Sequence, residues 1–486
     1  MSRQYETVIG LEVHVELGTK TKIFCGCSTE FGGAPNTHTC PVCTGMPGTL
    51  PVLNKKVVEY AAAVGLATHC TITQNCKFDR KNYFYPDNPQ NYQISQLYYP
   101  ICRNGFVDIE VDGKKSRIGI HEIHMEEDAG KLIHDPVTGN SLVDFNRSGV
   151  PLIEIVSEPD MRSAEEVIAY LEKLRMIIQY LGVSDCKLQE GSMRADVNLS
   201  VRTLGTKEYG TRTEMKNLNS FRAIARAIEG ERERQIELLE EGKVVVQETR
   251  RWDDEEAYSY PMRSKEDAQD YRYFPEPDLP PIYISDAWLD EIRAKQPEFR
   301  EEKQKRYQTE YGLPEYDIGI ITSDKKLSDL FEACISLGAA PKEVANWIMG
   351  DTMRLLKEYE MEPEDLHFQP AHLVQLITLI ESGMINRKVG RKVFEAIFKD
   401  DVEPEAYVEE HGLKTVNDAG ALRKVVKEIV ANNPKSVEDY KAGKKKAMGF
   451  FVGQTMRAMK GKADPAMVNQ ILQEMLDGVD AGIKKE

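Results

Sequence analysis

Acidic side chains and imidazoles are concentrated at the start of the stretch from Ile120 to Met161. Successive side chains of a β-strand point to opposite faces, so a strand here would place His124, Glu126 and Asp128 together, with Glu127 on the other face unless the strand bulges. The four acids and two histidines gathered within eight residues here resist burial in an apolar core. A divalent cation would relieve this cost, and so would simple solvation.

The same one-sided polarity recurs in three further predicted strands, TVIGLEVHVEL, RADVNLSVR and GTRTEMKNLN. Each alternates apolar residues with acids, amides and bases, which is the pattern of a half-buried strand. If the four polar faces meet, they suit a Mg²⁺–nucleotide site, because carboxylates hold the hard cation while Arg and Lys neutralise phosphate oxygens. As separate faces they are ordinary solvated strand surfaces.

Four cysteines form a second group with a chemically informative spacing. They follow the pattern C-x-C, twelve residues, then C-x-x-C. Two close pairs of thiolates can surround Zn²⁺ tetrahedrally, which we favour over four free thiols. Four sulfur ligands leave no open position, so we expect a structural zinc knuckle without a catalytic role. The expected ligands are Cys25, Cys27, Cys40 and Cys43.

The segment from Asp79 to Gln96 is rich in aromatic residues, amides and Pro, which predicts a loop or an irregular strand. Its rings could stack on nucleobases, or they could pack down on the sheet. Arg80 and Lys81 lie beside the rings and favour a loop that faces a ligand.

Two amphipathic helices are expected to cover the back of the sheet. The first begins at Ser163, which forms a capping box with Glu166, and ends at Gly182. The second runs from about Ser220 to Glu241. Neither helix carries an arrangement of side chains that indicates chemistry.

After about residue 293 the strand alternation stops and short helical patterns take over. The run from Val402 to His411 reads as a linker or short turn. The last segment begins near Leu413, is again helical, and holds eight bases against two acids between Lys435 and Lys462. Such a cluster is typical of a phosphate-backbone contact, and equally of a solvated helix end. The bases concerned are Lys444, Lys445, Lys446, Arg457, Lys460 and Lys462.

Length and composition limit the classes of protein. A chain of 486 residues predicts two to four domains. A net charge of −16 argues against extensive coating by nucleic acid but allows a local basic patch. The chain lacks a long apolar run and an apolar signal core at its start, so we expect a cytoplasmic protein without membrane spans.

Long segments throughout the chain resemble the GatB/GatE family of tRNA-dependent amidotransferase subunits. They are IGLEVHVEL, FDRKNYFYPDNPQNYQISQ, HMEEDAGK, DFNRSGVPLIEIVSEPD, EMKNLNSFRAI, DYRYFPEPDLPP and KAMGFFVGQTM. The resemblance implies an α+β fold in three parts. Residues 1–293 would form a cradle similar to glutamine synthetase, with an antiparallel sheet and the zinc knuckle at 25–43. Residues 294–411 would form an all-α domain, and residues 412–486 a small all-α tail that binds tRNA.

The resemblance also implies a reaction and partners. Glu misacylated on tRNA(Gln), or Asp on tRNA(Asn), is activated by ATP as an acyl phosphate and then amidated by ammonia. The ammonia would come through a tunnel from an amidase partner, and a small third partner would complete a heterotrimer. The sequence contains no G-x-x-x-x-G-K-[ST] loop and no recognisable amidase segment. The nucleotide must therefore be held in another way, and the ammonia must come from another chain.

Phosphorylation of a carboxylate requires Mg²⁺ and cationic residues more than it requires a nucleophile. We expect three of the acidic and imidazole residues to be catalytic, namely His14, Glu126 and Glu127. The expected magnesium ligands are Glu12, His14, Glu126, Glu127 and Glu214, with Asp196 as a further candidate. The expected ATP- and phosphate-binding residues are Arg212, Lys216, Arg263 and Arg272. The expected tRNA-binding residues are Lys444, Lys445, Lys446, Arg457 and Lys460.

Two other functions fit parts of the pattern. A free-standing ATP-dependent ligase that joins a small carboxylate to an amine would use the same polar face, but it leaves the basic tail unexplained. A non-catalytic tRNA-binding scaffold would explain the tail and leave the acid-rich strands without a role.

Overall fold

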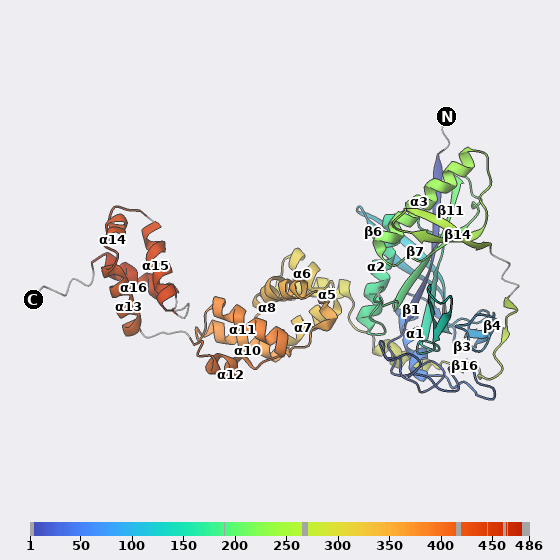
Figure 1. Ribbon diagram of the computed structural model, residues 1–486, viewed down its shortest axis with the longest axis horizontal. Helices are drawn as coiled ribbons and strands as arrows, with labels where there is room; N and C mark the ends of the chain where they lie inside the picture. Colours follow the sequence, from blue (N-terminus) through green and yellow to red (C-terminus); the bar gives the residue numbers. More distant parts are fainter. Residues whose placement is uncertain are drawn as a thin grey trace, which may run out of the picture. The chain divides into compact units, whose positions relative to one another are not determined.

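The computed structural model describes residues 4–188, 190–264, 271–414, 419–444, 446–459, 463 and 465–478. The chain divides into two compact units, residues 1–300 and residues 301–486. The first unit is a mixture of strands and helices, and the second is helical (Figure 1). The predicted order, an α+β region followed by an all-α region, is confirmed at this level.

A nine-stranded sheet organises the first unit. All of its neighbouring strands pair antiparallel except β12 and β13, which run parallel. Its strands, in order across the sheet, are β14 (Tyr258–Ser264), β13 (Glu248–Asp253), β12 (Thr213–Lys216), β11 (Met193–Thr203), β1 (Tyr5–Glu16), β10 (Pro151–Ser157), β7 (Lys114–Glu127), β6 (Cys102–Val111) and β2 (Thr71–Ile72).

Three helices pack against one face of this sheet, α1 (Lys55–Ala67), α2 (Ala164–Leu181) and α3 (Phe221–Glu240) (Figure 1). The alternate apolar residues of the strands point to this side and form one core with the helices, as Val13 and Leu174 illustrate with 0% exposure each. The polar residues between them consequently share the opposite face, because successive strand residues alternate.

Helix α2 has the predicted ends, with one difference at its start. Ser163 Oγ accepts a hydrogen bond from the Glu166 N–H, and Gly182 ends the helix at a φ of +68°. The Glu166 carboxylate, however, accepts from the N–H of Arg162 rather than from that of Ser163. The cap still satisfies two backbone N–H groups at the helix start.

Short strands surround the main sheet. The segment from Asp79 to Gln96, predicted as a loop or irregular strand, contains two short paired strands and the loop between them. These two strands are β4 (Asp79–Asn82) and β5 (Tyr92–Ser95), and β15 (Phe274–Pro275) pairs with β4 to complete a three-stranded sheet. Two further sheets have two strands each, β3 (Asn75–Cys76) with β16 (Ile282–Tyr283) and β8 (Lys131–His134) with β9 (Ser141–Asp144). Helix α4 (Asp286–Ala294) follows β16.

The second unit contains two apolar clusters, one between Tyr307 and Val408 and one between Leu422 and Leu476. The helices that supply the first are α5 (Arg300–Tyr311), α6 (Glu315–Ile321), α7 (Lys325–Ser336), α8 (Pro341–Trp347), the π-helix η2 (Ile348–Thr352), α9 (Met353–Glu358), α10 (Pro370–Glu381), α11 (Arg387–Asp400) and α12 (Pro404–Glu410). The 3-10 helix η3 (Pro363–Asp365) lies between α9 and α10 in the sequence and has no buried residue. Those that supply the second are α13 (Ala419–Ala431), α14 (Pro434–Lys441), α15 (Lys446–Ala458) and α16 (Pro465–Leu476).

The prediction of a linker at residues 402–411 was wrong, because α12 occupies most of it. Pro404 stands at the first helical position, where its missing N–H costs nothing. The Glu403 carboxylate caps the helix start and Val408 is fully buried, so the short segment is anchored in the core. Among the described residues, every helix is too short or too polar to cross a lipid bilayer.

Candidate functional site

Strand register gathers acidic residues and imidazoles on the face of the sheet that α1–α3 leave uncovered. On β1, His14 lies opposite Glu154 of β10, and Glu154 lies in turn opposite His124 of β7. On its other side β1 pairs with β11, which places Glu12 opposite Asp196. The central strand β1 thus links two groups of titratable side chains.

The first cluster consists of His14, His124, Glu126 and Glu154. His14 Nε2 lies 3.3 Å from Glu154 Oε2 and 3.6 Å from Glu126 Oε1. His124 Nε2 lies 3.2 Å from the same oxygen of Glu154. One ligand atom each of His14, Glu126 and Glu154 lies within 4.8 Å of the other two. Ligands of an octahedral Mg²⁺ are about 3–4 Å apart, so these donors fit around such an ion.

The charges of the first cluster are mutually dependent. Burial alone lowers the pKa of His14, but the carboxylates of Glu154 and Glu126 outweigh it and raise the pKa to about 9. The pKa of His124 is also raised well above its usual value, because Glu154 and its neighbours outweigh burial. Burial alone raises the pKa of Glu154, but the two imidazoles hold it well below the usual range. The carboxylates therefore require positive charge, which a bound cation would supply in place of these protons.

The second cluster consists of Glu12, Asp196 and Glu214 and contains a lysine. One carboxylate oxygen of each acid lies within 4.8 Å of the others. Lys216 Nζ lies 3.1 Å from Glu214 Oε1 and also bonds to Asp196. Thr249 Oγ1 donates to Glu214 Oε2 at 2.8 Å. Burial raises the pKa of Glu12 first, and the carboxylate of Glu154 in the first cluster adds to the shift, so the two clusters are electrostatically coupled.

The predicted magnesium ligands are thus divided between two clusters instead of surrounding one point. His14 and Glu126 belong to the first, and Glu12 and Glu214 to the second, together with the further candidate Asp196. Glu127 belongs to neither cluster, and the alternation of successive strand residues places it on the face of β7 opposite to that of Glu126.

The surroundings of Glu127 differ from those of its neighbour. Its carboxylate accepts a hydrogen bond of 3.0 Å from the N–H of Ile94 on β5. Its side chain lines a small cavity with Tyr83, Asp87 and Gln93. Burial raises the pKa of Glu127 to about 8. These contacts describe a carboxyl group that holds β5 against β7.

Glu154 was missed by the sequence analysis, although it contacts both imidazoles of the first cluster. The available signal was a single acid in the middle of the apolar strand PLIEIVS. Lys81 of β4 also lies near this cluster. Burial alone lowers its pKa, but Tyr273 first and then Glu126 and Glu154 raise it.

The predicted phosphate-binding residues lie in different places. Lys216 is inside the second cluster, whereas Arg212 is exposed and lines a pocket of about 260 Å³ together with Glu12 and Asn198. Arg263 lies on β14 opposite Thr249, which is the residue that bonds Glu214. Arg272 is exposed, and its carbonyl oxygen accepts a hydrogen bond from Asn82.

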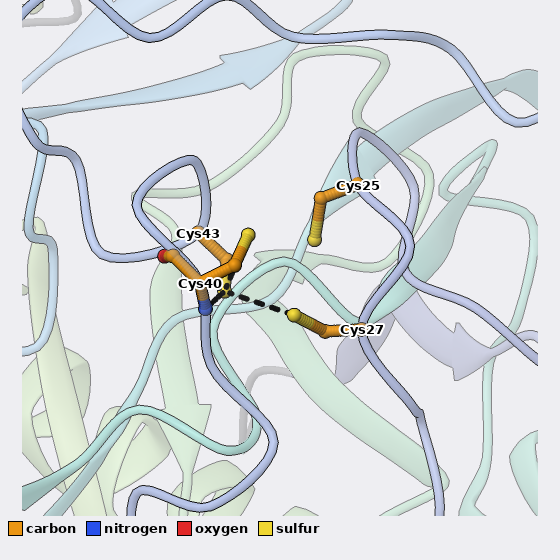
Figure 2. A group of neighbouring side chains, drawn as sticks. All are labelled: Cys25, Cys27, Cys40 and Cys43. Carbon is orange, nitrogen blue, oxygen red and sulfur yellow. Dashed lines mark hydrogen bonds between the residues drawn. The ribbon is translucent and has the colours of Figure 1, made fainter.

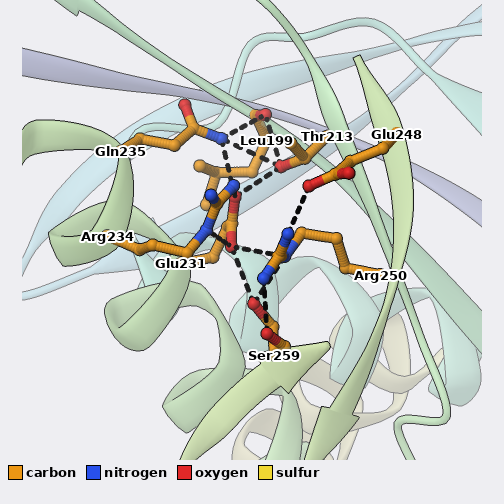
Figure 3. Close-up of polar contacts among 8 residues, drawn as sticks. All are labelled: Leu199, Thr213, Glu231, Arg234, Gln235, Glu248, Arg250 and Ser259. Carbon is orange, nitrogen blue, oxygen red and sulfur yellow. Dashed lines mark hydrogen bonds and ion pairs between the residues drawn. The ribbon is translucent and has the colours of Figure 1, made fainter. Parts of the chain in front are cut away.

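A buried polar network supports the strands of the second cluster from behind (Figure 3). Glu231 of α3 is fully buried, and its carboxylate accepts hydrogen bonds from Thr213 of β12, from Ser259 of β14 and from Arg234. Arg250 of β13 donates to Ser259 at 2.7 Å. Thr213 directly precedes Glu214 and Arg250 directly follows Thr249, so the network fixes the backbone on which the second cluster stands. The remaining members of the network are Leu199, Gln235 and Glu248.

The four predicted zinc ligands converge (Figure 2). Cys43 Sγ lies 3.9 Å from Cys40 Sγ and 4.0 Å from Cys27 Sγ, and all four sulfurs lie within 4.8 Å of one another. Sulfurs in a tetrahedral zinc site are about 3.8 Å apart, so the cluster fits the ion. A hydrogen bond with Cys25 lowers the pKa of Cys43 to about 4, which favours a thiolate at this position.

Three of the predicted tRNA-binding residues are described. Lys446 and Arg457 are exposed on α15, and Lys444 is exposed but paired with Asp439 at 2.8 Å. Lys445 and Lys460 lie outside the described residues.

Comparisons with known protein families identify the family to which the chain belongs. A family model described as the GatB/GatE catalytic domain matches residues 7–290, which contain both acidic clusters and the cysteine cluster. A second model, described as the GatB domain, matches residues 329–476. The chain belongs to the GatB/GatE family.

The relatives that resemble the chain share one name, being the B subunits of aspartyl/glutamyl-tRNA(Asn/Gln) amidotransferases. The protein from Lachnospira eligens is 69% identical, over 98% of this chain and 100% of its own length. The protein from Agathobacter rectalis is 68% identical over the same shares of the two chains. The protein from Caldicellulosiruptor bescii is 60% identical over 98% of this chain and 100% of its own length.

Proposed function

We propose that this chain is the component that carries out ATP-dependent transamidation of Glu-tRNA(Gln), Asp-tRNA(Asn) or both. The name shared by the relatives is that of an amidotransferase subunit for tRNA(Asn) and tRNA(Gln). Their sequence similarity to this chain extends over nearly its whole length. The observation that carries the chemistry is the convergence of acids and imidazoles from five strands of one sheet.

We assign one Mg²⁺ to His14, Glu126 and Glu154, and a second cation site to Glu12, Asp196 and Glu214. A bound cation would supply the positive charge that neutralises the phosphate oxygens of ATP. The imidazole of His14 would have to be neutral to act as a ligand, so binding would displace its proton. This division replaces the single five-residue set expected from the sequence.

The remaining charged residues have roles that follow from the same step. The side-chain carboxylate of the aminoacyl group is a poor acyl donor until its oxygen is phosphorylated. Lys216 and Arg212 lie beside the second cluster and would bear the charge of the transferred phosphate, with Arg263 and Arg272 as further candidates. Lys81, close to the first cluster, is suited to orient the carboxylate of the aminoacyl group.

The amine must come from a partner. As the resemblance implies, an amidase partner would deliver ammonia and a small third partner would complete a heterotrimer. The relatives are each named as one subunit of an amidotransferase, which supports a complex of several chains. Carboxylates at the point where the nitrogen source arrives would help to remove a proton from ammonium and so produce ammonia.

The proposed function assigns a separate role to each of three domains. We propose a catalytic cradle similar to glutamine synthetase at residues 1–293, a helical domain at 294–411 and a tRNA-binding tail at 412–486. The chain divides between residues 300 and 301, seven residues after the first boundary, and the two separate apolar clusters of the helical unit support the second. The exposed Lys446 and Arg457 support a phosphate-contacting role for α15. The cysteine cluster is assigned a structural Zn²⁺.

The test replaces Glu154 by Gln, which removes a charge from the first cluster and keeps the side-chain shape. Glu158→Gln is the matched control, because Glu158 lies just beyond the same strand, is 44% exposed and pairs with His121. With its partner chains present, the E154Q complex is expected to lose amide formation on Glu-tRNA(Gln) by about a hundredfold, even with ammonium chloride as the nitrogen source. Tight tRNA binding and the partner's glutaminase activity should persist in both variants.

Two results would contradict the proposal. Near-normal amide formation by E154Q would favour a non-catalytic scaffold. Efficient amidation of free glutamate without tRNA would favour a free-standing ligase.

A further inference from the structure

Lys22 is a lysine without exposed surface, located between the end of β1 and the cysteine cluster. Its Nζ donates to the His38 carbonyl oxygen at 2.8 Å and to the Phe145 carbonyl oxygen at 3.2 Å. The third contact is Cys43 Sγ, at 3.4 Å. The ammonium group is therefore fully enclosed and directed at a sulfur of the proposed zinc site.

A buried ammonium group is costly unless an anion lies nearby. In the part of the chain that the structure describes, no carboxylate forms an ion pair with Lys22. The anionic group that its surroundings offer is the cysteine cluster, because four thiolates outweigh the charge of one Zn²⁺ and leave the centre negative. The lysine and the metal–thiolate centre thus each supply the charge that the other requires.

The loop at residues 145–150 meets both groups. It precedes β10, which carries Glu154. Besides the contact from Lys22 to the Phe145 carbonyl, Ser148 Oγ donates to the Cys43 carbonyl oxygen at 3.0 Å. The N–H of Ile23 donates to the Gly149 carbonyl oxygen at 3.0 Å. Hydrogen bonds from Lys22, Ser148 and Ile23 therefore join the loop to the cysteine cluster and to the segment that leads into it.

We propose that Lys22 is the positioning residue of the zinc centre: its ammonium group neutralises the thiolates and ties zinc occupancy to the order of the 145–150 loop. This inference rests on the zinc site proposed above and is independent of the transamidation chemistry. It makes the knuckle a support for the strand that holds Glu154, even though the knuckle itself performs no chemistry.

The first test measures zinc retention in the full-length chain. Zinc is transferred to the chromogenic chelator 4-(2-pyridylazo)resorcinol and the release rate is followed by absorbance. Lys22→Met keeps the length of the side chain and removes the charge, and is expected to release zinc about tenfold faster. Lys20→Met is the matched control, because Lys20 is exposed two residues earlier, and it should release zinc at the wild-type rate.

The second test uses the wild-type chain, so it does not depend on whether K22M folds. Hydrogen exchange of the amides at 145–150 is compared before and after the zinc is removed, with helix α2 as an internal reference. Exchange is expected to accelerate in the loop and stay constant in α2. Equal zinc release by K22M and wild type, or a loop indifferent to zinc removal, would overturn the role of Lys22. A purified chain without zinc would overturn the metal assignment itself, while leaving the proposed transamidation untouched.

Discussion

Two adjacent glutamates show how strongly orientation decides the role of a side chain. Glu126 lies in the first cluster, whereas Glu127 points to the other face of β7 and accepts a hydrogen bond from the Ile94 N–H. A carboxylate that faces away from the proposed cation site would have no direct part in holding an ion there, even when it is the next residue in the chain.

Replacing Glu127 by Gln should accordingly leave the magnesium requirement in place. The Gln oxygen can still accept the hydrogen bond from Ile94, so the strand contact is kept. The Mg²⁺ concentration that half-saturates ATP hydrolysis is expected to stay within about twofold of wild type, whereas Glu126→Gln should raise it by about tenfold or more. A large rise for E127Q and none for E126Q would reverse the assignment.

At the scale of elements, the short strand β12 is held by polar contacts as well as by the burial of Met215. It has four residues and pairs parallel with β13, and a shift of one residue would turn Glu214 away from Glu12 and Asp196, its partners in the proposed cation site. Glu231 binds β12 and β14 at once from the helix side (Figure 3). A shifted register would lose both this polar network and the burial of Met215, so both favour the observed register.

Replacing Glu231 by Gln is expected to lower the free energy of unfolding by about 3 kcal/mol at pH 7, since buried Arg250 loses a charge partner. Burial alone raises the pKa of Glu231, but the hydrogen bonds from Arg234 and its other neighbours outweigh it and lower the pKa. A carboxyl group whose pKa is lowered by folding stabilises the fold above its unfolded pKa, about 4.3, and loses that contribution as pH falls below this value.

The difference between wild type and E231Q should therefore shrink on acidification below about pH 4. Urea unfolding at pH 7 and at lower pH measures it. The matched control is Glu229→Gln, because Glu229 is exposed on the same helix and should change stability little. A constant difference between E231Q and wild type at all pH values would show that the charge of Glu231 is not responsible.

At the scale of the whole molecule, the order of the strands and helices could be predicted from the sequence better than the clusters that their side chains form. The alternation in β1, β7 and β11 was sufficient to predict strands with one polar face, and Ser163 and Gly182 marked the ends of α2. The division of the acids into two clusters could not be predicted, because it depends on which strands are neighbours. Glu154 was missed because one acid in an apolar strand gives no periodic signal.

Lys22 and the linker show the same limit. A lone lysine in a turn reads as solvated, and only the folded chain encloses it against Cys43. Residues 402–411 looked like a linker because Pro404 and Gly412 suggest a break. The burial of Val408 in the helical core, a long-range effect, makes α12 a helix instead.

The measurement that tests the central claim most directly is a crystal structure of the full-length chain soaked with Mn²⁺ and a nonhydrolysable ATP analogue, with Mn²⁺ located by its anomalous scattering. Mn²⁺ takes oxygen and imidazole ligands and stands in for Mg²⁺. We predict one ion bound by His14, Glu126 and Glu154, and a second beside Glu12, Asp196 and Glu214, with the nucleotide phosphates in contact with them. Mn²⁺ and phosphates bound elsewhere, with no ion at either cluster, would contradict the assignment of both cation sites.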